Sequence, residues 1–285
     1  LMIGAEPPQL QHIQAKLGGV VLDVRGLTLA KEDHFGMILS DIRFEVKAGE
    51  ILGIAGVSGN GQQELMAALS GEDPRAERGA ISLFGTDIAQ ASPRKRRHLG
   101  LHFVPEERLG RGAVPTMSLA QNTLLTRTEA VSRSGWIANH RVRQLAADLI
   151  ARFNVKAGGP GAAAKSLSGG NLQKFIVGRE IDAGPKLLIV SQPTWGVDVG
   201  AAAQIRGALL KLRDEGCALL VVSEELDELF QISDRLLVIA QGRMSPSVPV
   251  AEATVEQIGI WMSGLWDGPD HGVGLRNTEA AHVQA

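Results

Sequence analysis

The second half of the chain alternates short, wholly apolar runs with longer amphipathic stretches. The apolar runs are Leu187–Val190, Ala218–Val222 and Leu236–Ala240, and helical spacing begins at Gly200 and again at Glu224. Strands that are apolar at every position and separated by helices are typical of a parallel sheet with helices on both faces. We therefore predict an α/β fold whose core is a mainly parallel sheet.

Shorter runs in the first half are apolar or alternate apolar with polar residues, and Gly, Lys or Asp bounds them. They are Val20–Val24, Ile42–Val46 and Ala80–Phe84, and a further run, Leu101–Val104, ends at Pro105. This pattern predicts strands. The first half is therefore expected to be rich in short strands.

Helical spacing replaces the strand pattern from about Pro115. Ser118 is placed to cap a helix through Leu125, and Asn139 to cap a longer helix. The longer helix carries one apolar stripe, formed by Val142, Leu145, Leu149 and Phe153. The Gly- and Ala-rich segment 156–165 is expected to loop back towards the sheet. We predict a helical insertion over about residues 115–184.

The ends of the chain differ in pattern from its middle. Residues 1–18 contain Pro7, Pro8 and scattered glutamines without a period, which is typical of a linker from a preceding domain, and Leu1 in place of methionine suggests a piece of a longer polypeptide. The folded domain is predicted over residues 19–264, with a capping box at Thr254 and Gln257 that starts its last helix. Residues 265–285 are expected to form a loose tail. The similarity of residues 1–4 to residues 261–264 is a weak sign of two related domains.

Composition excludes several classes of protein. Lys and Arg number 29 against 31 Asp and Glu, so the net charge of -2 gives no overall positive field for nucleic acid. The basic run Arg94–Arg97 is expected to be a solvated helix face. A single cysteine, Cys217, excludes an internal disulfide framework and fits a reducing compartment. No apolar stretch approaches the roughly 20 residues that cross a bilayer, so a membrane role is expected to go through partners.

A glycine-rich loop follows the apolar run Ile51–Ala55 and precedes an amphipathic helix. Strand, glycine loop and helix are the frame of a phosphate-binding loop, in which backbone N–H groups and the helix N-terminus face a polyphosphate. The usual motif also requires a lysine and a Mg²⁺-binding hydroxyl, where this chain has Gln62 and Gln63. The loop residues are Gly56, Ser58, Gly59, Asn60, Gly61, Gln62 and Gln63. Taken alone, the loop is better explained as an ordinary tight turn between a strand and a helix.

A second glycine motif gives the strongest signal. It consists of Leu167, Ser168, Gly169, Gly170, Asn171 and Gln173, at the start of a predicted helix. Ser168 supplies a hydroxyl, the glycines allow close backbone approach, and the helix N-terminus can face an anion. The motif resembles the signature sequence of ATP-binding-cassette (ABC) ATPases, and the resemblance covers residues 19–264. It implies a P-loop NTPase-type core with an antiparallel β edge subdomain and a helical signature subdomain.

The resemblance also shows where this chain departs from the family pattern. The acidic strand of the family ends in Asp-Glu, where this chain has Ser191 and Gln192; the switch histidine is replaced by Glu224, and the Q-loop glutamine by Glu106. Ser191 has no charge with which to hold a hard cation, and Gln192 cannot accept a proton. No intact catalytic residue and no metal ligand are therefore expected in this domain's own site. Loss of a general base typically costs about 10²- to 10⁴-fold in rate.

The intact motifs serve a different pocket in the family, in which two domains dimerise head to tail and each signature loop closes over the nucleotide of the other. The signature and Asp198, which matches the D-loop, make this chain resemble a donor half, with ATP and Mg²⁺ held at a composite site with a partner half. The partner is expected to be a first ATPase half on the same polypeptide. Phe35 is a candidate adenine-stacking residue, and a core position is the other explanation.

The motif combination of Pro105–Arg108, the signature and Gln192–Gly200 resembles the second ATPase half of bacterial importers for simple sugars and nucleosides, with Gln192 favouring the nucleoside branch. Such halves work with two integral membrane permease subunits and, indirectly, an extracytoplasmic solute-binding protein, at the cytoplasmic face of the plasma (inner) membrane. The region from Glu106 to Trp136 would contact the permease. Two alternatives stay open: a self-sufficient NTPase with unusual residues, and a non-transport cassette protein that acts on ribosomes or DNA, which the near-neutral charge disfavours.

Overall fold

The computed structural model describes residues 17–32, 34, 36–127, 132–133 and 136–266. Residues 1–16 of the predicted linker, Phe35, and residues 267–285 of the predicted tail lie outside the described residues. Within the described part, no helix is long and apolar enough to cross a membrane.

The central sheet has the strand order β12-β11-β3-β10-β9-β6, and β13 pairs with β11. Strands β11, β3, β10, β9 and β6 are parallel, whereas β12 and β13 pair antiparallel with β11. The bounds are β3 (Ile51–Ala55), β6 (Leu101–Val104), β9 (Leu187–Ser191), β10 (Ala218–Ser223), β11 (Arg235–Ala240), β12 (Arg243–Met244) and β13 (Val248–Pro249). The predicted mainly parallel core is confirmed.

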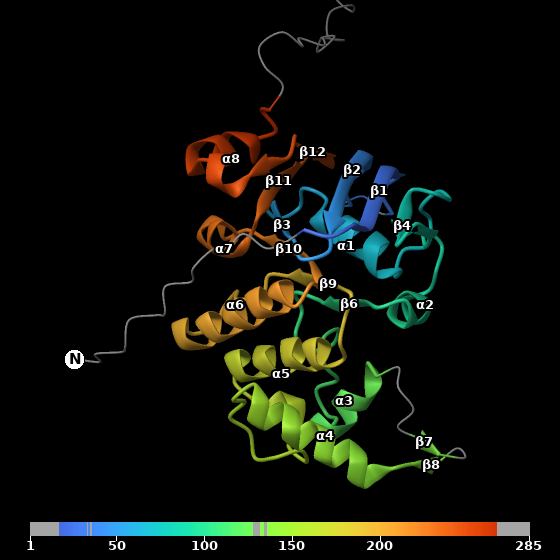
Figure 1. The fold of residues 1–285 in the computed structure, drawn as a ribbon, viewed down its shortest axis with the longest axis vertical. Coiled ribbons are helices and arrows are strands. Elements are labelled where there is room, and N and C mark those ends of the chain that lie inside the picture. The colour runs from blue at the N-terminus through green and yellow to red at the C-terminus, as the bar shows by residue number, and fades with distance from the viewer. Residues whose placement is uncertain (1–16, 33, 35, 128–131, 134–135, 267–285) are drawn as a thin grey trace, which may run out of the picture.

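A second, antiparallel sheet has the order β2-β1-β4-β5 and comes from the first third of the chain. Its strands are β1 (Val20–Leu29), β2 (Leu39–Lys47), β4 (Ile81–Leu83) and β5 (Thr86–Asp87), and a separate short pair is formed by β7 (Ser132–Arg133) and β8 (Trp136–Ile137). The antiparallel sheet packs over one face of the central sheet (Figure 1). This sheet is the β edge subdomain that the resemblance implied.

The helices are α1 (Gln62–Ser70), α2 (Pro93–His98), α3 (Leu119–Leu125), α4 (Asn139–Arg152), α5 (Gly169–Asp182), α6 (Val199–Asp214), α7 (Leu226–Ile232) and α8 (Val255–Trp261), with short 3₁₀ turns at Ala164–Ser166 and Val250–Glu252. In Figure 1, α3 and α4 lie on the far side of α5 from the central sheet. They form the helical insertion expected from the sequence.

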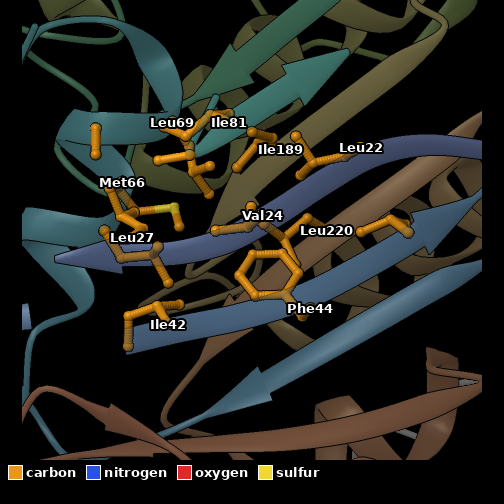
Figure 2. Close-up of a cluster of buried hydrophobic side chains, with 14 of the residues drawn as sticks. Leu22, Val24, Leu27, Ile42, Phe44, Met66, Leu69, Ile81, Ile189 and Leu220 are labelled. Atoms are coloured by element: carbon orange, nitrogen blue, oxygen red, sulfur yellow. The ribbon is translucent and has the colours of Figure 1, made fainter. Parts of the chain in front are cut away.

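The central strands bury both of their faces, because successive side chains point to opposite sides of a strand. Leu220 of β10 packs with Met66 of α1 and Phe44 of β2 in a core between the two sheets (Figure 2). Its neighbours Leu219 and Val221 pack on the other face, in a core with α5, α6, α7 and α8. This two-sided burial explains why the strand sequences are apolar at every position.

Two local predictions need correction. Asn139 is the first residue of α4 rather than its cap; Ala138 stands at the N-cap, without a side-chain cap hydrogen bond. The run Arg94–Arg97 lies in a helix, α2, but only part of it is solvated: Arg94 and Lys95 are exposed and Arg97 is half-buried, whereas Arg96 is fully buried. The Arg96 guanidinium donates to four backbone oxygen atoms, those of Ala68, Leu69, Ala89 and Ala91. Burial lowers the pKa of Arg96 to about 10.

Candidate functional site

The glycine loop joins β3 to α1 and is closed by one of its own side chains. The Gln62 side chain accepts a hydrogen bond from Asn60 N at 3.0 Å and donates one to the Val57 carbonyl at 2.7 Å. Asn60 also ties the loop to the turn after β11, because its Oδ1 accepts from Gln241 N at 2.8 Å. Gly61 caps α1 with φ of 108°, a conformation that favours glycine. At least one backbone N–H of the loop is therefore already paired with Gln62.

A pocket of about 400 Å³ lies next to this loop. Its walls come from α1, β6 and the turns after β6 and β9, at the carboxyl edge of the parallel strands, where ligands bind in such sheets. The lining residues are Gln62, Gln63, Met66, Phe103, Glu106, Glu107, Arg111, Ser191 and Trp195. Four of the six positions at which the sequence departs from the family pattern, Gln62, Gln63, Glu106 and Ser191, line this pocket; all six were expected to share one site, but Gln192 and Glu224 are not among the lining residues.

The other two departures, Gln192 and Glu224, contact each other just beyond the ends of β9 and β10. Gln192 has a positive φ of 50°, and its N–H donates to the Val222 carbonyl at 2.8 Å. Its Oε1 accepts from Glu224 N at 3.2 Å and from Ser223 Oγ at 3.4 Å. A non-glycine residue in this conformation is uncommon and is found often at functional sites. Gln192 is 7% exposed, so its amide acts here as a link between two strand ends.

A buried carboxyl group connects the same strand ends to the turn that follows β9. Glu228 of α7 accepts hydrogen bonds from Thr194 Oγ1 at 2.6 Å and from Ser223 Oγ at 3.0 Å. Burial raises the pKa of the Glu228 carboxyl above its ordinary value, although the two hydroxyl donors oppose this effect. No periodicity in the sequence indicates this link, because Glu228 is one of several acidic residues at a helix start.

The donors in the pocket do not fit Mg²⁺·ATP. Among the residues that the structure describes, no group of three or more His, Cys, Asp or Glu side chains could hold a metal ion. Hard cations need several oxygen ligands, preferably carboxylates; Ser191 and Gln63 offer only neutral groups here, and the two carboxylates of the lining, Glu106 and Glu107, do not form such a group of three. Arg111 lines the pocket but pairs with Glu72.

The signature residues lie at the exposed start of α5. Ser168 stands at the N-cap without capping the helix, and its hydroxyl accepts from Asn171 Nδ2 at 2.9 Å. Ser168 and Gly169 are exposed, whereas Gln173 is fully buried. Backbone N–H groups at the first turn of a long helix favour an anion. This surface therefore fits a phosphate group presented from outside the chain.

Asp198 lies beside the signature helix. Its Oδ1 caps α6 by accepting from Ala201 N at 2.9 Å. A Cβ atom at Gly170 would come within 3.1 Å of Asp198 Oδ2, so the absence of a side chain there permits the close approach of the two segments. We call residues 168–173 together with residues 193–198 the donor face.

Arg108, to which the sequence motifs assigned no role, connects this face to the pocket. Arg108, from the loop after β6, donates to Gln173 Oε1 at 3.2 Å and to the Trp195 carbonyl. The presence of an arginine in the segment Pro105–Arg108 was the only sign of it in the sequence.

The position of α5 is fixed by a buried ionic cluster near its C-terminal end. The Glu180 carboxylate accepts from Arg97 at 2.5 Å, from Arg179 at 2.9 Å and lies 3.0 Å from His102 Nδ1. Burial acts to raise the pKa of Glu180, but Arg179, His102 and Arg97 together lower it well below the ordinary value. Arg179 also donates to the Asn122 and Gly112 carbonyls, which joins α5 to the helical insertion.

Two groups of proteins resemble the chain in sequence. The nucleoside import ATP-binding protein NupA of Lactococcus lactis subsp. cremoris is 41% identical over 247 residues, which cover 86% of this chain and 48% of that protein. The ribose import ATP-binding protein RbsA of Bacillus licheniformis is 38% identical over 258 residues, which cover 90% of this chain and 51% of that protein. The chain thus spans about half the length of the curated relatives it matches.

Solved structures of ATP-binding cassettes share the fold. A nucleotide-free ATP-binding cassette from an ABC transporter superposes with a TM-score of 0.69 at 21% identity, covering 85% of this chain and 94% of that one. A dimeric cassette bound to ADP and Pi superposes with a TM-score of 0.67 at 18% identity, covering 80% of this chain and 98% of that one. The sequence model of the family described as ABC transporter matches residues 39–195. The chain therefore belongs to the ABC transporter family and has the α/β ABC ATPase fold.

Proposed function

We propose that this chain is the second ATPase half of an importer for simple sugars or nucleosides, with a degenerate site of its own and an intact donor face. The observation that carries the proposal is the contrast between two surfaces. The pocket beside the glycine loop lacks the lysine and the magnesium-binding hydroxyl of the usual loop. Ser168, Asn171 and Asp198 of the donor face match the family motifs.

The chemistry of the pocket supports weak or no hydrolysis at this chain's own site. A charged hydrogen bond of the kind a loop lysine makes is worth about 1.5–3 kcal/mol. Gln62 does not replace it, because both ends of its amide form hydrogen bonds with the loop backbone. Glu106 and Glu107 add negative charge to the pocket wall, which disfavours a polyphosphate. Gln192, at the general-base position, cannot accept a proton, and Glu224 places a carboxylate where the family has a donor.

The donor face supports a role in a neighbouring site. We infer that Ser168 and the first N–H groups of α5 contact the triphosphate of an ATP whose phosphates and Mg²⁺ are held by a first ATPase half of the same polypeptide. When bound, Mg²⁺ would polarise the phosphoryl oxygens there. The residues of this chain bind and orient the anion and exclude water from one side.

The solute class and the partners come from the relatives. NupA is named for nucleoside import, another relative in Bacillus subtilis for guanosine import, and RbsA for ribose import. By this similarity we propose two integral membrane permease subunits as direct partners and an extracytoplasmic solute-binding protein as an indirect one, with the chain peripheral at the cytoplasmic face of the inner membrane. Residues 106–136 would contact the permease, of which 128–131 and 134–135 lie outside the described residues.

ATP turnover tests the proposal. The 285-residue chain alone is expected to be monomeric and nearly inactive, and to stimulate turnover when it is joined to the first half. Ser168→Arg should abolish that stimulation, whereas Ser40→Arg, at an exposed serine of β2, should preserve it. Full stimulation by the Ser168→Arg protein would refute the donor role. Rapid turnover by the chain alone, unchanged by Gln62→Lys, would instead favour a self-sufficient NTPase.

A further inference from the structure

The side chain of Arg108 lies where three separate segments of the chain meet. Its Nε donates to Gln173 Oε1 of α5 at 3.2 Å, and its Nη2 donates to the Trp195 carbonyl in the turn after β9. A Cβ atom built at Gly169 would come within 2.8 Å of Arg108 Nη1, so the same guanidinium also lies against Gly169, the first of the two signature glycines. One planar group therefore contacts both parts of the donor face.

The partner of Arg108 on α5 extends the connection. Gln173 is fully buried, and while its Oε1 accepts from Arg108, its Nε2 donates to the Pro193 carbonyl at 3.0 Å. Both ends of the Gln173 amide are thus used, one on the arginine and one on the turn that leads to Asp198. Arg108 and Gln173 hold the turn at two successive points, the carbonyls of residues 193 and 195.

The loop that carries Arg108 is itself fixed. The Arg108 carbonyl accepts from Ala113 N at 2.7 Å, and the Glu107 carbonyl accepts from Gly112 N at 2.9 Å. Arg179 of α5 donates to the Gly112 carbonyl at 2.8 Å. The loop also carries Glu106, which lines the pocket beside the glycine loop. A displacement of this loop would therefore be transmitted to the donor face through the Arg108 guanidinium.

The contacts of Arg108 depend on its shape more than on its charge. Both of its hydrogen-bond partners are neutral oxygen atoms, and burial lowers the pKa of the guanidinium. Partial burial of a cation that has no carboxylate partner among the residues that the structure describes is costly, which favours a role that only the rigid fork of arginine can perform. A lysine, with its single nitrogen atom, cannot present the same fork to two acceptors.

We propose that Arg108 is a positioning residue that holds the signature helix start and the Pro193–Asp198 turn as one rigid donor face and ties that face to the loop bearing Glu106. The importance of this face for catalysis rests on the proposed function. The mechanical part of the inference does not, because it concerns contacts within this chain.

Amide hydrogen exchange on the 285-residue chain tests the mechanical part. Arg108→Lys is expected to speed exchange at least about tenfold at the hydrogen-bonded amides of the donor face, those of residues 172, 195 and 197, relative to β1 and β3, since local opening reports local contacts. Arg78→Lys, at an exposed arginine between α1 and β4, is the matched control and should leave these rates unchanged. Unchanged exchange at the donor face would overturn the inference. An equal acceleration everywhere would overturn it too, because Arg108 would then support the whole fold.

Turnover by the full polypeptide tests the consequence for catalysis. Arg108→Lys is expected to lower kcat by about 10- to 100-fold, the usual cost of misplacing a group by about 1 Å, while KM for ATP changes less than about threefold. If Ser168→Arg is inactive and Arg108→Lys turns over normally, the Arg108 inference fails and the donor role stands. If Ser168→Arg is fully active, the proposed function fails, and the exchange experiment still decides whether Arg108 fixes the face.

Discussion

Removing the charge of Glu180 should destabilise the protein strongly, because its carboxylate is the shared acceptor of a buried cationic cluster. The side chain is fully buried and accepts from Arg97 and Arg179, and it lies 3.0 Å from His102 Nδ1. Arg179 is itself only 3% exposed in its side chain. Glu180→Gln would leave these two arginines without their carboxylate, and breaking a buried ion pair on one side costs about 3–5 kcal/mol.

The pH dependence of this loss follows from the lowered pKa of Glu180. A carboxyl group whose pKa is lower in the folded state than in the unfolded state stabilises the fold above its unfolded pKa and loses that contribution as the pH falls. The gap in unfolding free energy between the native and Glu180→Gln proteins should therefore be largest near pH 7. It should narrow progressively as the pH falls below the ordinary value of 4.5.

Urea unfolding followed by tryptophan fluorescence at pH 7 and pH 4 measures both effects. Glu77→Gln, at an exposed carboxylate before β4, is the matched control and should change the unfolding free energy by less than about 0.5 kcal/mol. A loss below about 1 kcal/mol for Glu180→Gln at pH 7 would contradict the buried-pair argument, since it would fall in the range of exposed pairs. A gap that widens as the pH falls would show that the sign of the pKa shift is wrong.

Three further changes test local features. Ser118→Ala removes the hydroxyl that accepts from Gln121 N in the capping box of α3 and should cost about 1 kcal/mol in urea unfolding; Ser118→Thr should restore most of it. Gly61→Ala forces a Cβ to within 2.9 Å of Leu39 Cδ2 at a positive φ, with an expected loss of about 1–3 kcal/mol in the same measurement. Glu228 has a raised pKa, so its ionisation opposes folding as the pH rises through its folded pKa. Glu228→Gln should therefore remove the loss of stability that the Glu228 carboxyl contributes as the pH rises above its ordinary pKa of 4.5, and an unchanged pH profile would contradict this assignment.

Local patterns were sufficient for most of the secondary structure. The caps are set by residues within one turn: Ser118 caps α3 as expected, in a full capping box with Gln121, whereas of the capping box expected at Thr254 the structure shows one hydrogen bond, from Gln257 N to Thr254 Oγ1. The central strands were recognisable because both of their faces are buried, which makes every position apolar. The segments that escaped, such as β5, β12 and β13, are two residues long and owe their pairing to distant strands rather than to their own sequence.

Non-local contacts explain where the sequence was a poor guide. Arg96 reads as a surface cation, yet it is buried against carbonyl oxygen atoms of residues 68 and 69 at the end of α1, which no spacing in the sequence announces. For the site, four of the six residues that the motifs grouped, Gln62, Gln63, Glu106 and Ser191, line one pocket, because parallel strands bring their carboxyl ends together, whereas Gln192 and Glu224 do not line it. The role of Arg108 depends on partners 65 and 87 positions further along the chain, so it required the structure.

The glycine loop between β3 and α1 is held in one conformation by hydrogen bonds to its own Gln62 side chain. The Gln62 amide pairs with the N–H of Asn60 and the carbonyl of Val57. In a flexible turn these two groups would form hydrogen bonds with water or with a bound ligand instead. If the neighbouring half performs the hydrolysis, the conformational entropy lost and regained in each cycle is confined to that half. The half formed by this chain would then keep its conformation while the other half binds and releases nucleotide. The two halves would differ in how much they move during a cycle.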